Sequence, residues 1–94
     1  FNGSNLDQIL NNMGIKNLIF CGVATNYCVE TSVRDAGDRD FNVVLLNDAC
    51  ATFTPEQDLM SCKILDECYC KVKTTDEVLA QIQRLASSQI QTAV

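Results

Sequence analysis

Residues 18–29 decide the fold of this chain, and they read LIFCGVATNYCV. They begin with a continuous apolar run, which is the pattern of a strand buried on both faces. The residues after Cys28 follow a helical period, so we expect Cys28 at a turn between a strand and a helix. Unpaired backbone N–H groups at the start of a helix favour a thiolate over a thiol. The stretch therefore predicts a nucleophilic Cys28 in a chain that contains no histidine.

Three short strands are expected, at residues 18–23, 43–46 and 70–74. The second should stop at Asn47-Asp48-Ala49, and the third is more polar, which places it nearer a sheet edge. Because amphipathic helices separate the strands, we expect parallel pairing through right-handed crossovers. The sequence thus predicts an α/β fold of three layers (α-β-α), in which a parallel sheet lies between two layers of helices. Such a small sheet leaves two long edges open, so we infer that further strands are missing from this chain or come from a partner.

Four helices accompany these strands. Ser4 can cap the first and Gly14 can end it. Thr54-Pro55 and the pair Thr74 and Glu77 are typical helix starts, the pair forming a capping box. The positions expected to be buried are Val29, Val33 and Ala36 in the second helix, Leu59, Met60, Cys62, Ile64 and Leu65 in the third, and Val78, Leu79, Ile82, Leu85 and Ala86 in the fourth. Residues 87–94 carry little pattern and are expected to fray.

Composition excludes several classes of partner. The formal net charge is −5 and the seven basic residues form no cluster, so binding to nucleic acid is not expected. No apolar run approaches the roughly 20 residues that a membrane span requires. Six cysteines are present, but regular periodicity around them is unlike a disulfide scaffold, so we expect free thiols in a reducing cytoplasm. Cys68-x-Cys70 is tighter than the usual zinc pair, and we expect neither a metal nor another cofactor.

Four segments carry a resemblance to a known family. Residues 22–30 read GVATNYCVE, residues 34–36 read RDA, residues 48–49 read DA and residues 1–6 read FNGSNL. Together they resemble the isochorismatase-like cysteine hydrolase superfamily, from Phe1 to about Ile82. That group includes isochorismatases, nicotinamidases, N-carbamoylsarcosine amidohydrolases and ureidoacrylate or biuret amidohydrolases. The resemblance implies a Rossmann-like isochorismatase fold and makes residues 1–94 the carboxy-terminal half of one hydrolase domain.

The resemblance also implies roles for residues of the first loop. Cys28 matches the nucleophile, which attacks the carbonyl of an amide, ureide or carbamate. The N–H groups of Ala24 and Cys28 would form the oxyanion hole, and the peptide bond between Val23 and Ala24 is the candidate for the family's cis bond. An aspartate and a lysine complete the family's triad, and both are expected upstream of Phe1. The fragment alone is therefore expected to be inactive.

Substrate contacts are expected at the carboxyl ends of the strands, where open α/β sheets bind ligands. Asn26 and Tyr27 follow the loop into the mouth of the site, and Phe53 lies in the next loop along the chain. Two of them have another interpretation, because Asn26, like Thr25, can cap a helix, and Phe53 can line an interface. Asp48 is expected to cap or brace a loop, and Arg34-Asp35 to form a solvated or paired helix face.

The leading hypothesis is a hydrolase that cleaves a non-peptide C–N bond of a small amide or ureide through a cysteine thioester. Asn26 after Ala24-Thr25 is similar to the ureidoacrylate and biuret branch. One alternative is an inactive hydrolase-like subunit that serves interactions. Others are an isochorismatase-type hydrolase of another small metabolite and a redox-sensing thiol protein. By analogy with the superfamily, we expect a homo-oligomer.

Overall fold

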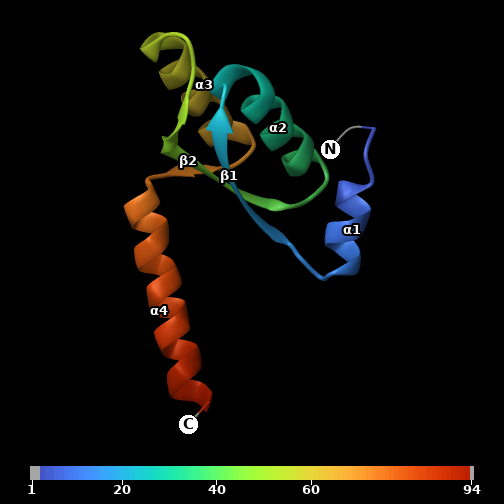
Figure 1. The fold of residues 1–94 in the computed structure, drawn as a ribbon, viewed down its shortest axis with the longest axis vertical. Coiled ribbons are helices and arrows are strands. Elements are labelled where there is room, and N and C mark those ends of the chain that lie inside the picture. The colour runs from blue at the N-terminus through green and yellow to red at the C-terminus, as the bar shows by residue number, and fades with distance from the viewer. Residues whose placement is uncertain (1–2, 94) are drawn as a thin grey trace.

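The fold of the chain alternates helices and strands, as predicted. The computed structural model describes residues 3–93, with side chains described as far as residue 87. The elements, drawn in Figure 1, are α1 (Leu6–Asn12), β1 (Asn17–Val23), the π-helical turn η1 (Thr25–Val29), α2 (Glu30–Asp38), β2 (Asn42–Ala51), α3 (Pro55–Cys68), β3 (Lys71–Lys73) and α4 (Thr75–Ala93).

The three strands form one parallel sheet in the order β1-β2-β3. Phe20 pairs with Leu45, but Gly22 pairs with Cys50, so β2 bulges outward between these two pairs. The prediction that the second strand stops at residues 47–49 is therefore wrong. The local turn preference of Asn-Asp is overridden because the residues beyond it pair again with the end of β1. The predicted edge position of the third strand is confirmed.

The core lies between one face of the sheet and the two helices α2 and α3 (Figure 1). Val33, Ala36, Leu45 and Leu65 are completely buried, and the predicted buried stripe of the second helix is confirmed. The prediction that β1 is buried on both faces is wrong. Its residues alternate between half-buried and exposed, and Ile19 is 52% exposed, because little of this chain covers the second face of the sheet.

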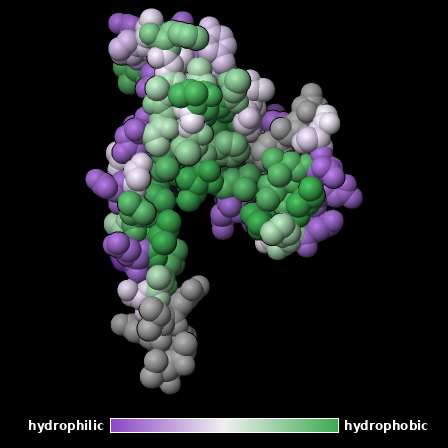
Figure 2. All heavy atoms as spheres, in the orientation of Figure 1, coloured by the Kyte–Doolittle hydropathy of each residue, from purple (hydrophilic) through white to green (hydrophobic). Residues whose placement is uncertain are grey.

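The predicted inner faces of the last two helices are only partly confirmed. In α3 the buried residues are Ser61, Cys62 and Leu65. In α4 Val78 is buried, and the helix then projects away from the body of the molecule (Figure 1). The exposed residues among those expected to be buried are Leu59, Met60, Ile64, Leu79, Ile82, Leu85 and Ala86. Figure 2 shows apolar side chains running from the body of the molecule along one side of α4.

Side-chain caps mark where α3 and α4 begin. Thr54 accepts a hydrogen bond from the Gln57 N–H at 3.2 Å and thereby caps α3. Thr74 and Glu77 bond each other's backbone N–H groups, which confirms the capping box at the start of α4. Capping satisfies N–H groups that have no partner inside the helix, which is why these motifs mark helix starts.

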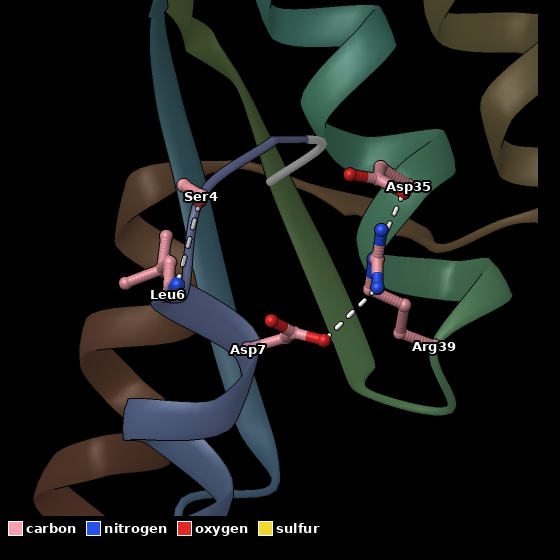
Figure 3. Close-up of polar contacts among 5 residues, drawn as sticks. All are labelled: Ser4, Leu6, Asp7, Asp35 and Arg39. Atoms are coloured by element: carbon pink, nitrogen blue, oxygen red, sulfur yellow. Dashed lines mark hydrogen bonds and ion pairs between the residues drawn. The ribbon is translucent and has the colours of Figure 1, made fainter.

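The first helix is held from two directions (Figure 3). The Ser4 hydroxyl accepts from the Leu6 N–H at 3.4 Å, although the residue at the cap position is Asn5, one later than predicted. Arg39 forms ion pairs with Asp35 at 3.0 Å and with Asp7 at 2.9 Å, and it thereby joins α1 to α2. Asp35 thus lies on a paired helix face, as expected.

The far end of the chain is described only in part. The helix α4 continues to Ala93, but side chains after residue 87 lie outside the described residues, so the predicted fraying of residues 87–94 stays a prediction. Among the described residues, no helix is both long and apolar enough to cross a bilayer.

Candidate active site

Cys28 lies at the turn between β1 and α2, as the sequence predicts. The strand ends at Val23, the peptide bond from Val23 to Ala24 is cis, and the π-helical turn that follows contains Cys28. The Cys28 side chain is exposed. A thiol is thereby presented to solvent at the carboxyl end of a strand, which is where ligands bind in open parallel sheets.

The backbone at the start of the turn offers a hydrogen-bond donor. The carbonyl oxygen of Ala24 accepts hydrogen bonds from the N–H groups of Tyr27 at 3.1 Å and Val29 at 3.2 Å. Ala24 lies between β1 and η1, and among the loop and turn hydrogen bonds of the described residues, none is donated by its N–H. The Ala24 N–H can therefore donate to a ligand.

The structure brings the predicted substrate-binding residues to one place. The rings of Tyr27 and Phe53 meet edge to face, with their centroids 6.0 Å apart. Tyr27 is 52% exposed and Phe53 is 81% exposed. The Thr52 hydroxyl donates to the side-chain oxygen of Asn26, so the loop after β2 lies against the turn that carries Cys28. An exposed aromatic pair of this kind offers apolar ring surface to a ligand.

Thr25 does not cap a helix, and its structural role was missed by the sequence analysis. Its side chain is completely buried, and its hydroxyl donates to Oδ1 of Asp58 on α3. Ser61, one turn further along α3, donates to Oε1 of Glu30 and also lies 3.5 Å from the carbonyl oxygen of Thr25. A signal was present in the sequence, because Asp58 and Ser61 are polar residues on the same helix face as Cys62 and Leu65.

The polar contacts continue from Glu30 to the end of α3. Arg34 pairs with Glu30 at 3.2 Å, and its guanidinium carbon lies 4.8 Å from the centroid of the Tyr69 ring.

Asp48 accepts hydrogen bonds from both the N–H and the hydroxyl of Thr75, which confirms its expected bracing role. These hydrogen bonds, the one from the hydroxyl first, lower the pKa of Asp48.

The six cysteines lie in different surroundings. Burial raises the pKa of the Cys62 and Cys70 thiols to about 11, and it also raises the pKa of Cys50. Cys21 and Cys68 are exposed, although the apolar run that contains Cys21 predicts its burial. In the part of the chain that the structure describes, no three Cys, Asp or Glu side chains are grouped closely enough to hold a metal ion.

A hollow of about 680 Å³ lies elsewhere, between the sheet and α4. Ile19, Val44, Val78 and Ile82 are among its lining residues, and Cys28 is not. The hollow therefore belongs to the uncovered face of the sheet and not to the site around the thiol.

Comparison with known protein families gives a match over most of the chain. The family model described as the isochorismatase domain matches residues 1–77. The chain belongs to the isochorismatase family. This confirms the resemblance carried by residues 22–30 and by the shorter segments around them.

Curated members of the isochorismatase family include close matches to this chain. A ureidoacrylate amidohydrolase, RutB, from Azorhizobium caulinodans is 46% identical over 56 residues, which are 60% of this chain and 25% of that protein. An uncharacterized isochorismatase family protein, YwoC, from Bacillus subtilis is 32% identical over 83 residues, which are 88% of this chain and 44% of that protein. The chain thus spans less than half the length of these relatives.

Solved structures of the isochorismatase family show the same fold. A hydrolase assigned to the family from Chromobacterium violaceum is 34% identical with a TM-score of 0.87, over 89% of this chain and 49% of that one. Pyrazinamidase of Pyrococcus horikoshii, solved in complex with zinc, is 35% identical with a TM-score of 0.75, over 79% of this chain and 41% of that one. The predicted α/β fold with a parallel sheet is therefore confirmed.

Proposed function

We propose that Cys28 is the nucleophile of a cysteine hydrolase that cleaves a non-peptide C–N bond of a small amide or ureide. The observation that carries the proposal is an exposed thiol on the turn after β1, at whose start the N–H of Ala24 donates none of the loop and turn hydrogen bonds of the described residues. A reactive thiol and nearby donors are the components that acyl transfer requires.

The chemistry would follow the ordinary course of acyl transfer. The Cys28 sulfur attacks the carbonyl carbon, and the negative charge that develops on oxygen is held by the N–H groups of Ala24 and Cys28. One such donor contributes about 3 kcal/mol to catalysis. The intermediate collapses by breaking the C–N bond, the amine leaves with a proton, and the acyl group remains as a thioester. Water then hydrolyses the thioester, which releases the acid and restores the thiol.

The residues at the mouth of the site support a small, flat substrate. Tyr27 and Phe53 offer their ring edges and faces, and Asn26 offers an amide that is already held by Thr52. Proteins similar to this chain include one named a ureidoacrylate amidohydrolase and one named a pyrazinamidase. We favour a ureide or a related amide for this reason.

The proton carrier and the group that favours the thiolate would come from outside these 94 residues. The resemblance requires an aspartate and a lysine, and no position of this chain matches either. Because the chain spans less than half of its relatives, we propose that turnover needs the rest of the domain. Assembly into a homo-oligomer stays a prediction.

Replacement of Cys28 tests the proposal in the protein encoded by the complete gene. Cys28→Ala should lower kcat for ureide and amide substrates by about a thousandfold or more, because the covalent route is lost. Cys21→Ala and Cys68→Ala are matched controls, since both thiols are exposed, and they should retain kcat within about twofold.

Three outcomes would contradict the proposal. Turnover that survives in Cys28→Ala would exclude the covalent mechanism. A complete protein that turns over no amide or ureide, while Cys28 reacts with iodoacetamide no faster than Cys21 and Cys68, would favour the inactive interaction subunit. Reversible oxidation of Cys28 without turnover would instead favour a redox sensor.

A further inference from the structure

We propose that Thr25 and Asp58 are positioning residues, which hold the turn that carries Cys28 in its reactive geometry. The inference rests on the proposed function of Cys28, and it assigns a task to two side chains that would not touch the substrate. It starts from the burial of Thr25 and from the direction of its hydrogen bond.

The Thr25 side chain is a polar group placed entirely inside the protein. It is 0% exposed, and its hydroxyl donates to Oδ1 of Asp58, which lies 33 residues later in the sequence. A buried hydroxyl without a partner is costly, so this bond fixes where Thr25 can lie relative to α3. Thr25 directly follows Ala24, whose N–H is a proposed oxyanion donor.

Two further contacts join the same segments. The Thr52 hydroxyl donates to Asn26, and Ser61 donates to Glu30 while lying 3.5 Å from the Thr25 carbonyl oxygen. Residues 52–61 therefore contact the chain on both sides of Cys28, at residues 25–26 before it and at residue 30 after it.

Contacts from α3 and from the loop after β2 supplement the backbone hydrogen bonds of the turn. Its first carbonyl, that of Ala24, accepts from Tyr27 and Val29. No side chain caps its amino-terminal end. A catalytic group that is misplaced by about 1 Å can lose a hundredfold in rate, so contacts that fix the turn have kinetic consequences. We infer that the bond from Thr25 to Asp58 is one of these contacts.

The test compares variants of the complete protein by kcat, KM and thermal unfolding. Thr25→Val keeps the shape of the side chain and removes the donor, and Asp58→Ala removes the acceptor. Each should lower kcat about ten- to a hundredfold while KM changes less than about threefold. Thr25→Ser restores the hydroxyl and should recover kcat to within about threefold of the wild type.

A double variant and a stability control separate positioning from general destabilisation. Thr25→Val combined with Asp58→Ala should lower kcat no further than either change alone, because both remove the same bond. Val33→Ala leaves a cavity in the core at a completely buried residue, so it should lower the melting temperature and leave kcat within about twofold. Asp58→Ala serves if Thr25→Val fails to fold, since Asp58 is only half-buried.

The outcomes distinguish the two proposals. If Cys28→Ala is inactive but Thr25→Val or Asp58→Ala keeps its kcat, the positioning role is overturned and the nucleophile stands. Effects that multiply in the double variant would also overturn the positioning role. If Cys28→Ala itself turns over substrate, the proposed function fails first.

Discussion

Exposure alone does not distinguish Cys28 from the other thiols of this chain, because Cys21 and Cys68 are exposed as well. What differs is the backbone around the sulfur. Cys28 lies on a helical turn after a strand end, whereas Cys21 lies within β1 and Cys68 ends α3. Chemical identity and accessibility therefore do not define the site, and the local path of the main chain does.

At the same scale, the carboxylate of Asp48 should make stability depend on pH. The hydrogen bonds from Thr75 lower the pKa of this carboxyl group. Its contribution to the free energy of unfolding is therefore fully present above the ordinary pKa of 3.8, and it is lost as the pH falls through the lowered pKa. Asp48→Asn keeps an acceptor oxygen but not the charge. We expect this variant to melt below the wild type near neutral pH, and the difference to vanish in acid.

Thr75→Val provides the control for this measurement. Without the Thr75 hydroxyl, the loss of stability caused by Asp48→Asn should become smaller at every pH above 3.8. A loss that is the same at neutral and acid pH would contradict the assigned role of the Asp48 carboxylate.

Residue-level prediction from sequence succeeded where the pattern is local. Cys28 was placed correctly because the strand, the turn and the helix are continuous in sequence. Asp58 and Ser61 were missed as parts of the site because they meet Thr25 and Glu30 from more than 30 residues away. Periodicity places Asp58 and Ser61 on the same face of α3 as Cys62 and Leu65, but it does not say which residues of the turn this face contacts.

At the scale of elements, helix starts were predicted better than helix faces. The caps at Thr54 and Thr74 depend on side chains within three residues, so a short motif is sufficient to identify them. The apolar faces of α3 and α4 depend on what covers them. Leu59 and Leu79 have the correct spacing for burial but remain 73% and 49% exposed.

The cap of α3 can be tested by substitution. Thr54→Ala removes the oxygen that accepts from the Gln57 N–H, and we expect a loss of about 1 kcal/mol in the free energy of unfolding, measured with urea. Thr31→Ala is the matched control, because Thr31 is an exposed threonine within α2 and alanine is the better helix former there. Equal losses in the two variants would contradict the capping role.

At the scale of the whole molecule, the described residues leave a large apolar surface exposed. One face of the sheet and one side of α4 expose apolar side chains, including Ile19 and Ile82 (Figure 2). Solved relatives are about twice as long as the part of them that this chain matches. We therefore expect the rest of the same domain to cover these residues in the complete protein.

A charge placed on this face tests the expectation. Ile82→Glu should lower the free energy of unfolding of the complete protein by about 2–4 kcal/mol, because a covered site would bury an unpaired carboxylate. Gln83→Glu adds the same charge at the neighbouring exposed position of α4 and should change stability by less than about 0.5 kcal/mol. Similar small effects in both variants would show that Ile82 stays in water.

The two tyrosines have an optical consequence. These 94 residues contain no tryptophan, so their ultraviolet fluorescence comes from Tyr27 and Tyr69. Tyr27 is half-exposed against Phe53, whereas Tyr69 lies against the Arg34 guanidinium at the edge of the core. In a Tyr69→Phe variant of these 94 residues the remaining tyrosine emission would come from the mouth of the site alone. Arrival of a ligand there could then be followed by quenching, with no dye attached.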